Sequence, residues 1–152
     1  MRFRYFRVFL TVAFLIAAFR SRSFAGSTNA CTIVTRADVG TAVGHGTVTP
    51  GKLQQYPNDP TSQCQYDTDA GNVVVLFDPA DGDRNFSAVQ GSYGALQTVP
   101  GIGDAAVYSK QHGTLAIRKG HTDVLLTLAT PDEARGYAVL MALAHRVALR
   151  LH

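Results

Sequence analysis

The sequence has few of the residues that usually build catalytic, redox or metal centres. It contains no tryptophan, two methionines and only two cysteines, Cys31 and Cys64. These cysteines do not form a Cys-x-x-Cys pair, so a thioredoxin-like redox site is not expected. The five histidines include no pair separated by one helical turn, so no zinc site on a helix is predicted.

Long apolar runs are also scarce, and the main one lies at the N-terminus. Three arginines, Arg2, Arg4 and Arg7, precede an apolar run over residues 8–19, which is the order found in secretory signals. The run is too short for a bilayer, which needs roughly 20 apolar residues. We predict a signal peptide over residues 1–25, with cleavage after Ala25 or, alternatively, after Ala30.

A lipoprotein is the competing interpretation of this segment, with Cys31 as the acylated residue. A lipobox has an apolar residue three positions before its cysteine, whereas residues 28–30 here read Thr-Asn-Ala. We therefore expect a periplasmic or secreted protein without a membrane span after processing. A short tail over residues 26–30 would precede a single domain over residues 31–152.

The charge balance changes when the signal peptide is removed. Residues 1–25 hold five arginines and no acidic residue, so the formal net charge falls from +3 to −2. The remaining basic residues do not cluster. Nucleic acids and anionic membranes are therefore not expected as partners.

An even number of cysteines in an exported chain predicts a disulfide, and Cys31 with Cys64 is the single possible pairing. Two free, buried thiols are the alternative. The disulfide would connect the first helix to the sheet. We expect that helix to begin after a Thr35 cap, with Asp38 in its first turn, and to end at Gly44.

Short runs rich in β-branched residues alternate with turn residues in the rest of the chain. We expect at most an edge strand near 46–49, a hairpin of 64–67 and 72–78, and three strands at 105–109, 114–118 and 123–129. A second helix begins at Asp81 and carries an apolar stripe of Phe86, Val89, Tyr93 and Leu96.

The last helix is predicted to start at a Thr130 cap, with Pro131 in its first turn. Its expected apolar stripe is Tyr137, Leu140, Met141, Ala144, Val147, Ala148 and Leu151, and Arg146 and Arg150 lie near its negative end. The predicted fold class is α+β. One antiparallel sheet of about five or six strands carries helices, in the order helix, strands, helix, three strands, helix.

Three short motifs resemble a group of small exported bacterial domains of unknown function. The group includes lipoprotein domains and the extracytoplasmic sensor domains of mycobacterial receptor-like kinases. The motifs are Cys31 to Thr35 before a helix, Cys64 to Tyr66 on a strand, and Gly101 to Ala106 followed by the strand over 115–120. The resemblance implies a Cys31–Cys64 disulfide and a non-enzymatic binding or sensing role, and it carries over no functional residues.

Three patterns that suggest chemistry lack the context it requires. The dinucleotide-like spacing of Gly101, Gly103 and Ala106 precedes a predicted strand, where the motif needs a helix. The calcium-loop-like Asp81, Asp83 and Asn85 lack the glycine and the bidentate glutamate of such a loop. A triad of Asp104, Ser109 and His112 lacks a nucleophile elbow. We therefore expect no catalytic residues, no metal and no cofactor.

Two predicted strands are apolar on successive residues, at 73–77 and 124–126, so both faces of the sheet are apolar there. Helices can cover both faces, which is the structural alternative. The composition favours that structural alternative; the functional hypothesis is that Val74, Leu76 and Leu125 form a face that contacts an apolar ligand or a partner chain. The expected function is an exported, non-catalytic binding or sensing module of the cell envelope; the alternative is an assembly protein that docks another envelope protein through its sheet face or edge.

Overall fold

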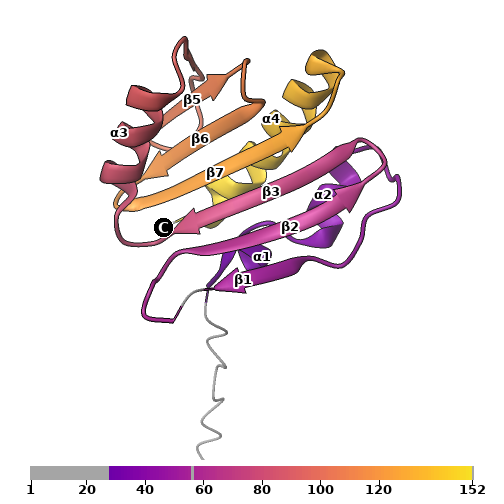
Figure 1. Cartoon of the computed structure of the whole chain (residues 1–152), viewed down its shortest axis with the longest axis horizontal. Coiled ribbons are helices and arrows are strands. Elements are labelled where there is room, and N and C mark those ends of the chain that lie inside the picture. Colours follow the sequence, from indigo (N-terminus) through magenta and orange to yellow (C-terminus); the bar gives the residue numbers. More distant parts are fainter. Residues whose placement is uncertain (1–27, 56, 152) are drawn as a thin grey trace, which may run out of the picture.

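The computed structural model describes residues 28–55 and 57–151, and its centre is one antiparallel sheet of seven strands (Figure 1). The predicted signal peptide and its cleavage site at Ala25 lie outside the described residues. The strand order is β1-β2-β3-β7-β6-β5-β4. The strands are β1 (Lys52–Gln55), β2 (Ser62–Thr68), β3 (Gly71–Asp78), β4 (Gln97–Thr98), β5 (Ala105–Ser109), β6 (Thr114–Lys119) and β7 (Thr122–Ala129).

Four helices pack on the two faces of this sheet. Three of them, α1 (Ala30–Ile33), α2 (Arg36–Ala42) and α4 (Glu133–Arg150), lie on one face, behind the sheet in Figure 1. The helix α3 (Gly82–Ser92) packs on the opposite face against β6 and β7. The α+β class and the single antiparallel sheet are confirmed.

The hydrophobic core is divided unequally between the two faces. The larger cluster lies between the sheet and α1, α2 and α4, and it contains fully buried side chains such as Leu126, Leu140 and Leu143. The smaller cluster lies under α3 and consists of Phe86, Val89, Val107 and Ala116. The sheet is thus covered along one face and only in part on the other.

The sheet has more strands than the five or six predicted. The first strand is β1, at Lys52–Gln55, while the predicted edge strand near 46–49 is reduced to an isolated bridge between Val48 and Thr68. All four residues of β1 are exposed, so this strand has no alternating apolar pattern to detect. The two-residue strand β4 was not predicted either, because its residues are both polar and exposed.

Helices α1 and α3 differ from the prediction, whereas α2 agrees with it at its start. An additional helix, α1, precedes α2; Asn29 caps it and shares a reciprocal capping box with Thr32. Helix α3 ends at Ser92, before Tyr93 and Leu96, although both side chains still pack on the smaller cluster. Helix α2 keeps its predicted Thr35 cap.

The predicted Thr130 cap of α4 is wrong, because the helix begins at Glu133 and Asp132 caps it. The Thr130 hydroxyl accepts a hydrogen bond from the Asp132 amide, so it closes a turn before the helix. The predicted apolar stripe of α4 is largely confirmed, because Leu140, Ala144, Val147 and Leu151 are buried. Val139 and Leu143 are buried in addition, whereas the side chain of Tyr137 is exposed.

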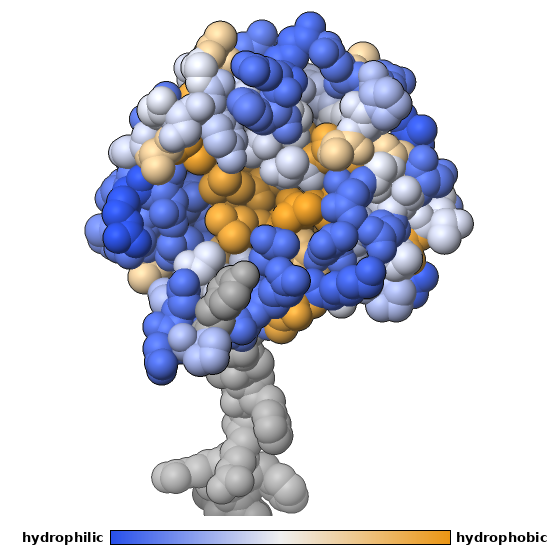
Figure 2. Space-filling model, in the orientation of Figure 1, coloured by the Kyte–Doolittle hydropathy of each residue, from blue (hydrophilic) through white to orange (hydrophobic). Residues whose placement is uncertain are grey.

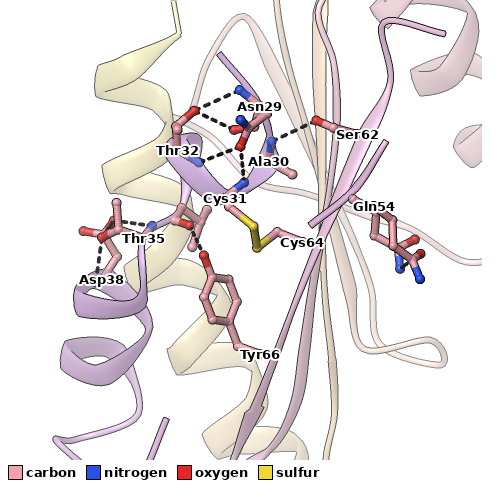
Figure 3. The surroundings of a disulfide bond; sticks show 12 residues. Asn29, Ala30, Cys31, Thr32, Thr35, Asp38, Gln54, Ser62, Cys64 and Tyr66 are labelled. Atoms are coloured by element: carbon pink, nitrogen blue, oxygen red, sulfur yellow. Dashed lines mark hydrogen bonds between the residues drawn. A yellow bond between two sulfur atoms is a disulfide. The ribbon is translucent and has the colours of Figure 1, made fainter. Parts of the chain in front are cut away.

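Cys31 and Cys64 form the predicted disulfide, with their Cα atoms 5.1 Å apart (Figure 3). It joins α1 to β2. Next to it, the Ala30 amide donates to the Ser62 hydroxyl, and the Tyr66 hydroxyl donates to the Val34 carbonyl. The disulfide and these two hydrogen bonds fix the N-terminal segment to the sheet.

Candidate functional site

No helix within residues 28–55 and 57–151 lies over one half of one sheet face. Helix α3 covers β5, β6 and part of β7, so β1, β2 and β3 are open on the same side of the sheet (Figure 1). The side chains of this face follow from the strand register, since directly paired residues point to one side. Leu76 is paired with Gln63 and Leu125, and Val74 is paired with Gln65 and Thr127.

The three residues predicted as an interaction face lie together on this open half. Val74, Leu76 and Leu125 are partly buried, whereas their strand neighbours Val75 and Leu126 point into the main core and are fully buried. Figure 2 shows apolar side chains gathered in the middle of this face, with polar residues around them. Successive apolar residues on β3 and β7 therefore supply both a core and a partly exposed face.

A groove of about 210 Å³ runs between this face and α3. Leu76 and Leu125 lie on its sheet side. The helix side consists of Asn85, Ala88, Val89, Ser92 and Tyr93. We call this hollow the apolar groove. Its sheet residues Leu76 and Leu125 belong to the predicted interaction face, whereas the predicted apolar stripe of the second helix, which includes Val89 and Tyr93, had not been assigned to a site.

The polar residues around the apolar groove are mostly uncharged, paired or buried. Gln54, Gln63 and Gln65 continue the open face across β1 and β2. The Lys52 Nζ lies 3.2 Å from the Asp67 carboxylate, and Arg118 lies 2.8 Å from Asp83 of α3. Asp78 follows Leu76 by two residues and Asp123 precedes Leu125 by two, so both acids lie on the same face, where they are almost completely buried. The chemistry of the groove is thus apolar contact with amide and hydroxyl groups at its border.

Two acidic residues lie side by side where α3 meets the sheet. Asp78 on β3 and Asp123 on β7 are register partners, and both are almost completely buried. The Asp78 carboxylate accepts hydrogen bonds from the amides of Ala80 and Asp81 and from the side chain of Asn85. Burial alone would raise the pKa of Asp78, but these donors hold it below its ordinary value.

Asp123 has no such donors. Its side chain is 1% exposed, and among the described residues neither carboxylate oxygen has a hydrogen-bond partner. Burial, and then the negative charge of Asp78, raise the pKa of Asp123 to about 7, and the nearby Val124 amide opposes this only in part. The sequence placed Asp123 at the start of a strand and gave no sign of its burial.

A second hollow, of about 330 Å³, lies between the β5–β6 connection and the start of α4. Its lining includes Tyr108, Lys110, His112 and Glu133. The two charged side chains are paired, with Lys110 Nζ 2.9 Å from Glu133 Oε2, and both are mostly exposed. His112 stacks on Tyr93. Because Lys110 and Glu133 pair with each other and His112 stacks on Tyr93, this hollow is the weaker candidate for a binding site.

Most residues of the patterns that resembled catalytic or metal motifs have structural partners, and Ser109 is the exception in the described part of the chain. Asp81 pairs with Arg84, Asp83 pairs with Arg118, and Asn85 binds Asp78. Asp104 accepts a hydrogen bond from the Gly120 amide. The Ser109 hydroxyl is buried and has no partner in the described part of the chain.

The predicted dinucleotide-like turn leads into strand β5, as expected from the sequence. Gly101 and Gly103 adopt positive φ angles of 78° and 59°. A Cβ atom at Gly103 would lie 2.5 Å from the Arg118 carbonyl oxygen, so this turn requires glycine. His152, one of the five histidines, lies outside the described residues.

Within residues 28–55 and 57–151, no group of three or more His, Cys, Asp or Glu side chains is arranged to hold a metal ion. None of the helices in these ranges combines the length and the apolar character needed to cross a bilayer. Comparison of the chain with protein-family models, with curated proteins and with solved structures finds no match.

Proposed function

We propose that the protein is an exported, non-catalytic binding module, and that the apolar groove holds an apolar group of its ligand. The observation that carries this proposal is the partial exposure of Leu76 and Leu125 beside α3, on a face that continues across β1 and β2 with glutamine side chains. A ligand that removes neighbouring, partly exposed apolar side chains from water lowers the free energy of the complex. The resemblance to exported sensor domains and the disulfide are compatible with this role.

The size of the groove limits what it can hold. Small-molecule pockets usually measure at least about 300 Å³, whereas the apolar groove measures about 210 Å³. It therefore fits one part of a ligand, such as a short hydrocarbon chain or one or two apolar side chains. The rest of the ligand would lie over the glutamines of β1 and β2, whose amides can both donate and accept hydrogen bonds.

The test is the binding of an uncharged apolar fluorophore, N-phenyl-1-naphthylamine, to the disulfide-bonded protein and to the variants L76Q and L125Q. Loss of leucine contact should weaken binding about tenfold or more. L149Q is the matched control, because Leu149 is 82% exposed on α4, on the opposite side of the sheet. Absence of binding, or equal weakening by L149Q, would contradict the proposal.

The assembly alternative is favoured by one further observation, the position of β1 at the edge of the open half-face. An edge strand presents unpaired amides and carbonyls that a partner strand can use. The variant Q55P removes a backbone donor from β1 at a residue that points, like its register partner Ser62, to the face opposite the groove, and it therefore separates the two functions. It would abolish a complex formed through the edge, as measured by light scattering, and leave fluorophore binding unchanged.

A further inference from the structure

Asp123 is the most unusual buried group in the described part of the chain. A buried, ionised carboxylate without donors is strongly unfavourable, and a second carboxylate beside it increases the cost. Asp78 has already used its four acceptor sites on Thr61, Ala80, Asp81 and Asn85. Asp78 is therefore the charged member of the pair, and Asp123 is the member for which the neutral form is favoured.

The acidic pair lies under the first turn of α3. The Gly82 amide, at the start of that helix, donates to the His121 carbonyl on the β6–β7 connection. A Cβ atom at position 82 would lie 2.6 to 2.9 Å from backbone atoms of residues 121–123. The helix start is thus packed directly against the backbone of Asp123, and any group that enters to solvate this carboxylate must displace α3.

We propose that Asp123 is a proton-controlled latch for α3: its carboxyl group is neutral while α3 lies on the sheet, and its ionisation loosens the helix. Because α3 supplies one wall of the apolar groove, ionisation would widen or disorder that groove. This inference deepens the proposed function and rests on it for its biological meaning. The movement of α3 itself is measured without any ligand.

The charged groups around Asp123 explain how its ionisation would weaken the contacts between α3 and the sheet. Arg118 on β6 is the register partner of Asp123 on the side opposite to Asp78. Its guanidinium now binds Asp83 on α3 at 2.8 Å and lies over the Phe86 ring. An ionised Asp123 would compete with Asp83 for this guanidinium. Arg118 would then lose its contacts with Asp83 and Phe86, which hold α3 on the sheet.

Other titratable groups near the latch are paired or point elsewhere. The Asp81 carboxylate pairs with Arg84 within α3. Lys119 donates to the Ala148 carbonyl of α4, on the opposite face. His121 Nδ1 lies 3.8 Å from Asp83, and its side chain is mostly exposed. Because histidine titrates in the same pH range, His121 needs its own control.

The sign of the effect follows from proton linkage. The pKa of Asp123 is raised to about 7 with α3 in place, and it returns to about 4 once water reaches the carboxylate. The closed state therefore holds a proton that the open state releases between these values. Opening should become about tenfold more favourable for each pH unit from about 4 to about 7, and should be constant above about 7.

The experiment is amide hydrogen exchange of residues 82–92 in the disulfide-bonded protein, corrected for the intrinsic pH dependence of exchange. We expect opening of α3 to rise about fiftyfold between pH 5 and pH 7. The variant D123N, which stays neutral, should show no such rise, and H121Q should retain it. Equal protection of α3 at both pH values, or an unchanged slope in D123N, would overturn the proposal.

A measurement on the unsubstituted protein covers the case in which D123N fails to fold. The chemical shift of the Asp123 side-chain carboxyl carbon should titrate near neutral pH; a carboxylate already ionised at pH 5 would overturn the latch.

Calcium chloride is the second probe, and restoration of α3 protection at pH 7 by calcium alone would show that a cation, not a proton, neutralises the pair. If the protein does not bind the fluorophore but α3 still opens as the pH rises, the proposed function is rejected and the role of Asp123 in holding α3 is retained.

Discussion

Arg150 donates to both carboxylate oxygens of Asp38, at 2.6 and 3.0 Å, although the two residues are 112 positions apart. Arg146 adds a third contact, at 3.2 Å, and the Thr35 amide and hydroxyl add two more. Arg150 also donates to the Ile33 carbonyl of α1. The end of α4 is thereby joined to both N-terminal helices around one buried acid.

We predict that D38N and R150Q each lower the free energy of unfolding by about 2 kcal/mol, because each leaves a charged partner without its hydrogen bonds. The value is set below that of a fully buried pair, since the Arg150 side chain is 38% exposed. Urea unfolding followed by circular dichroism measures it. K52Q breaks the exposed pair with Asp67 and serves as the control, with little expected change. Equal effects of K52Q and R150Q would contradict this account.

The acid limb of the stability curve should also depend on Asp38. Burial alone would raise the pKa of Asp38, but hydrogen bonds from Arg150 and Thr35 hold it well below its ordinary value. The stabilisation is therefore present above about pH 4 and is lost as the pH falls below that value. We expect R150Q to unfold at a higher pH than the unsubstituted protein in an acid titration. Superimposed acid titrations would show that Arg150 does not hold Asp38 ionised.

Asp123 should produce the opposite dependence, with stability decreasing as the pH rises. Its folded-state pKa of about 7 exceeds its unfolded value of about 4, so the cost grows between these values and reaches at most about 4 kcal/mol above them. We predict that D123N is more stable than the unsubstituted protein at pH 8 and loses that advantage at pH 5. Thermal unfolding at the two pH values measures the difference, and greater stability of the unsubstituted protein at pH 8 would contradict it.

These two acids show where sequence reasoning reached its limit. Asp38 was correctly placed in the first turn of a capped helix, because a capping box is a local signal. Its contact with Arg150 was not predicted, because it depends on how two distant helices pack. Asp123 was placed correctly on its strand, but its burial depends on α3 lying over the β6–β7 connection.

Some strands of the sheet could be predicted from the sequence and others could not. The β2–β3 hairpin and the three strands β5, β6 and β7 were predictable, because they combine apolar runs with short polar connections. Strands β1 and β4 were not, because edge strands made of exposed polar residues have no periodic pattern. The face of Val74, Leu76 and Leu125 was predictable since apolar side chains on successive strand residues must point to both sides; the helix wall beside it was not.

The disulfide is expected to contribute strongly to stability. Cys31 and Cys64 close a loop with a sequence separation of 33 residues. In the chain-entropy model, such a loop corresponds to about 3 to 4 kcal/mol. We predict a loss of this size in the double variant C31S/C64S, measured by urea unfolding, and no response of that variant to dithiothreitol. Unchanged stability would show that the segment is held by its hydrogen bonds and packing alone.

The contacts of Asn29, Ala30 and Cys31 lead to a prediction about where a signal peptide would be cleaved. Ala30 is completely buried, its amide donates to the Ser62 hydroxyl at 2.9 Å, and Asn29 caps α1. Cleavage after Ala30 would remove both residues from the fold, whereas cleavage after Ala25 leaves both in place. The Cys31 sulfur is also bonded to Cys64, so it cannot carry a lipid thioether at the same time. We therefore predict that the exported protein begins at Gly26 and is not acylated, which intact-mass spectrometry and N-terminal sequencing would measure. An N-terminus at Cys31, with or without added lipid, would contradict the prediction and would require α1 to fold without its cap.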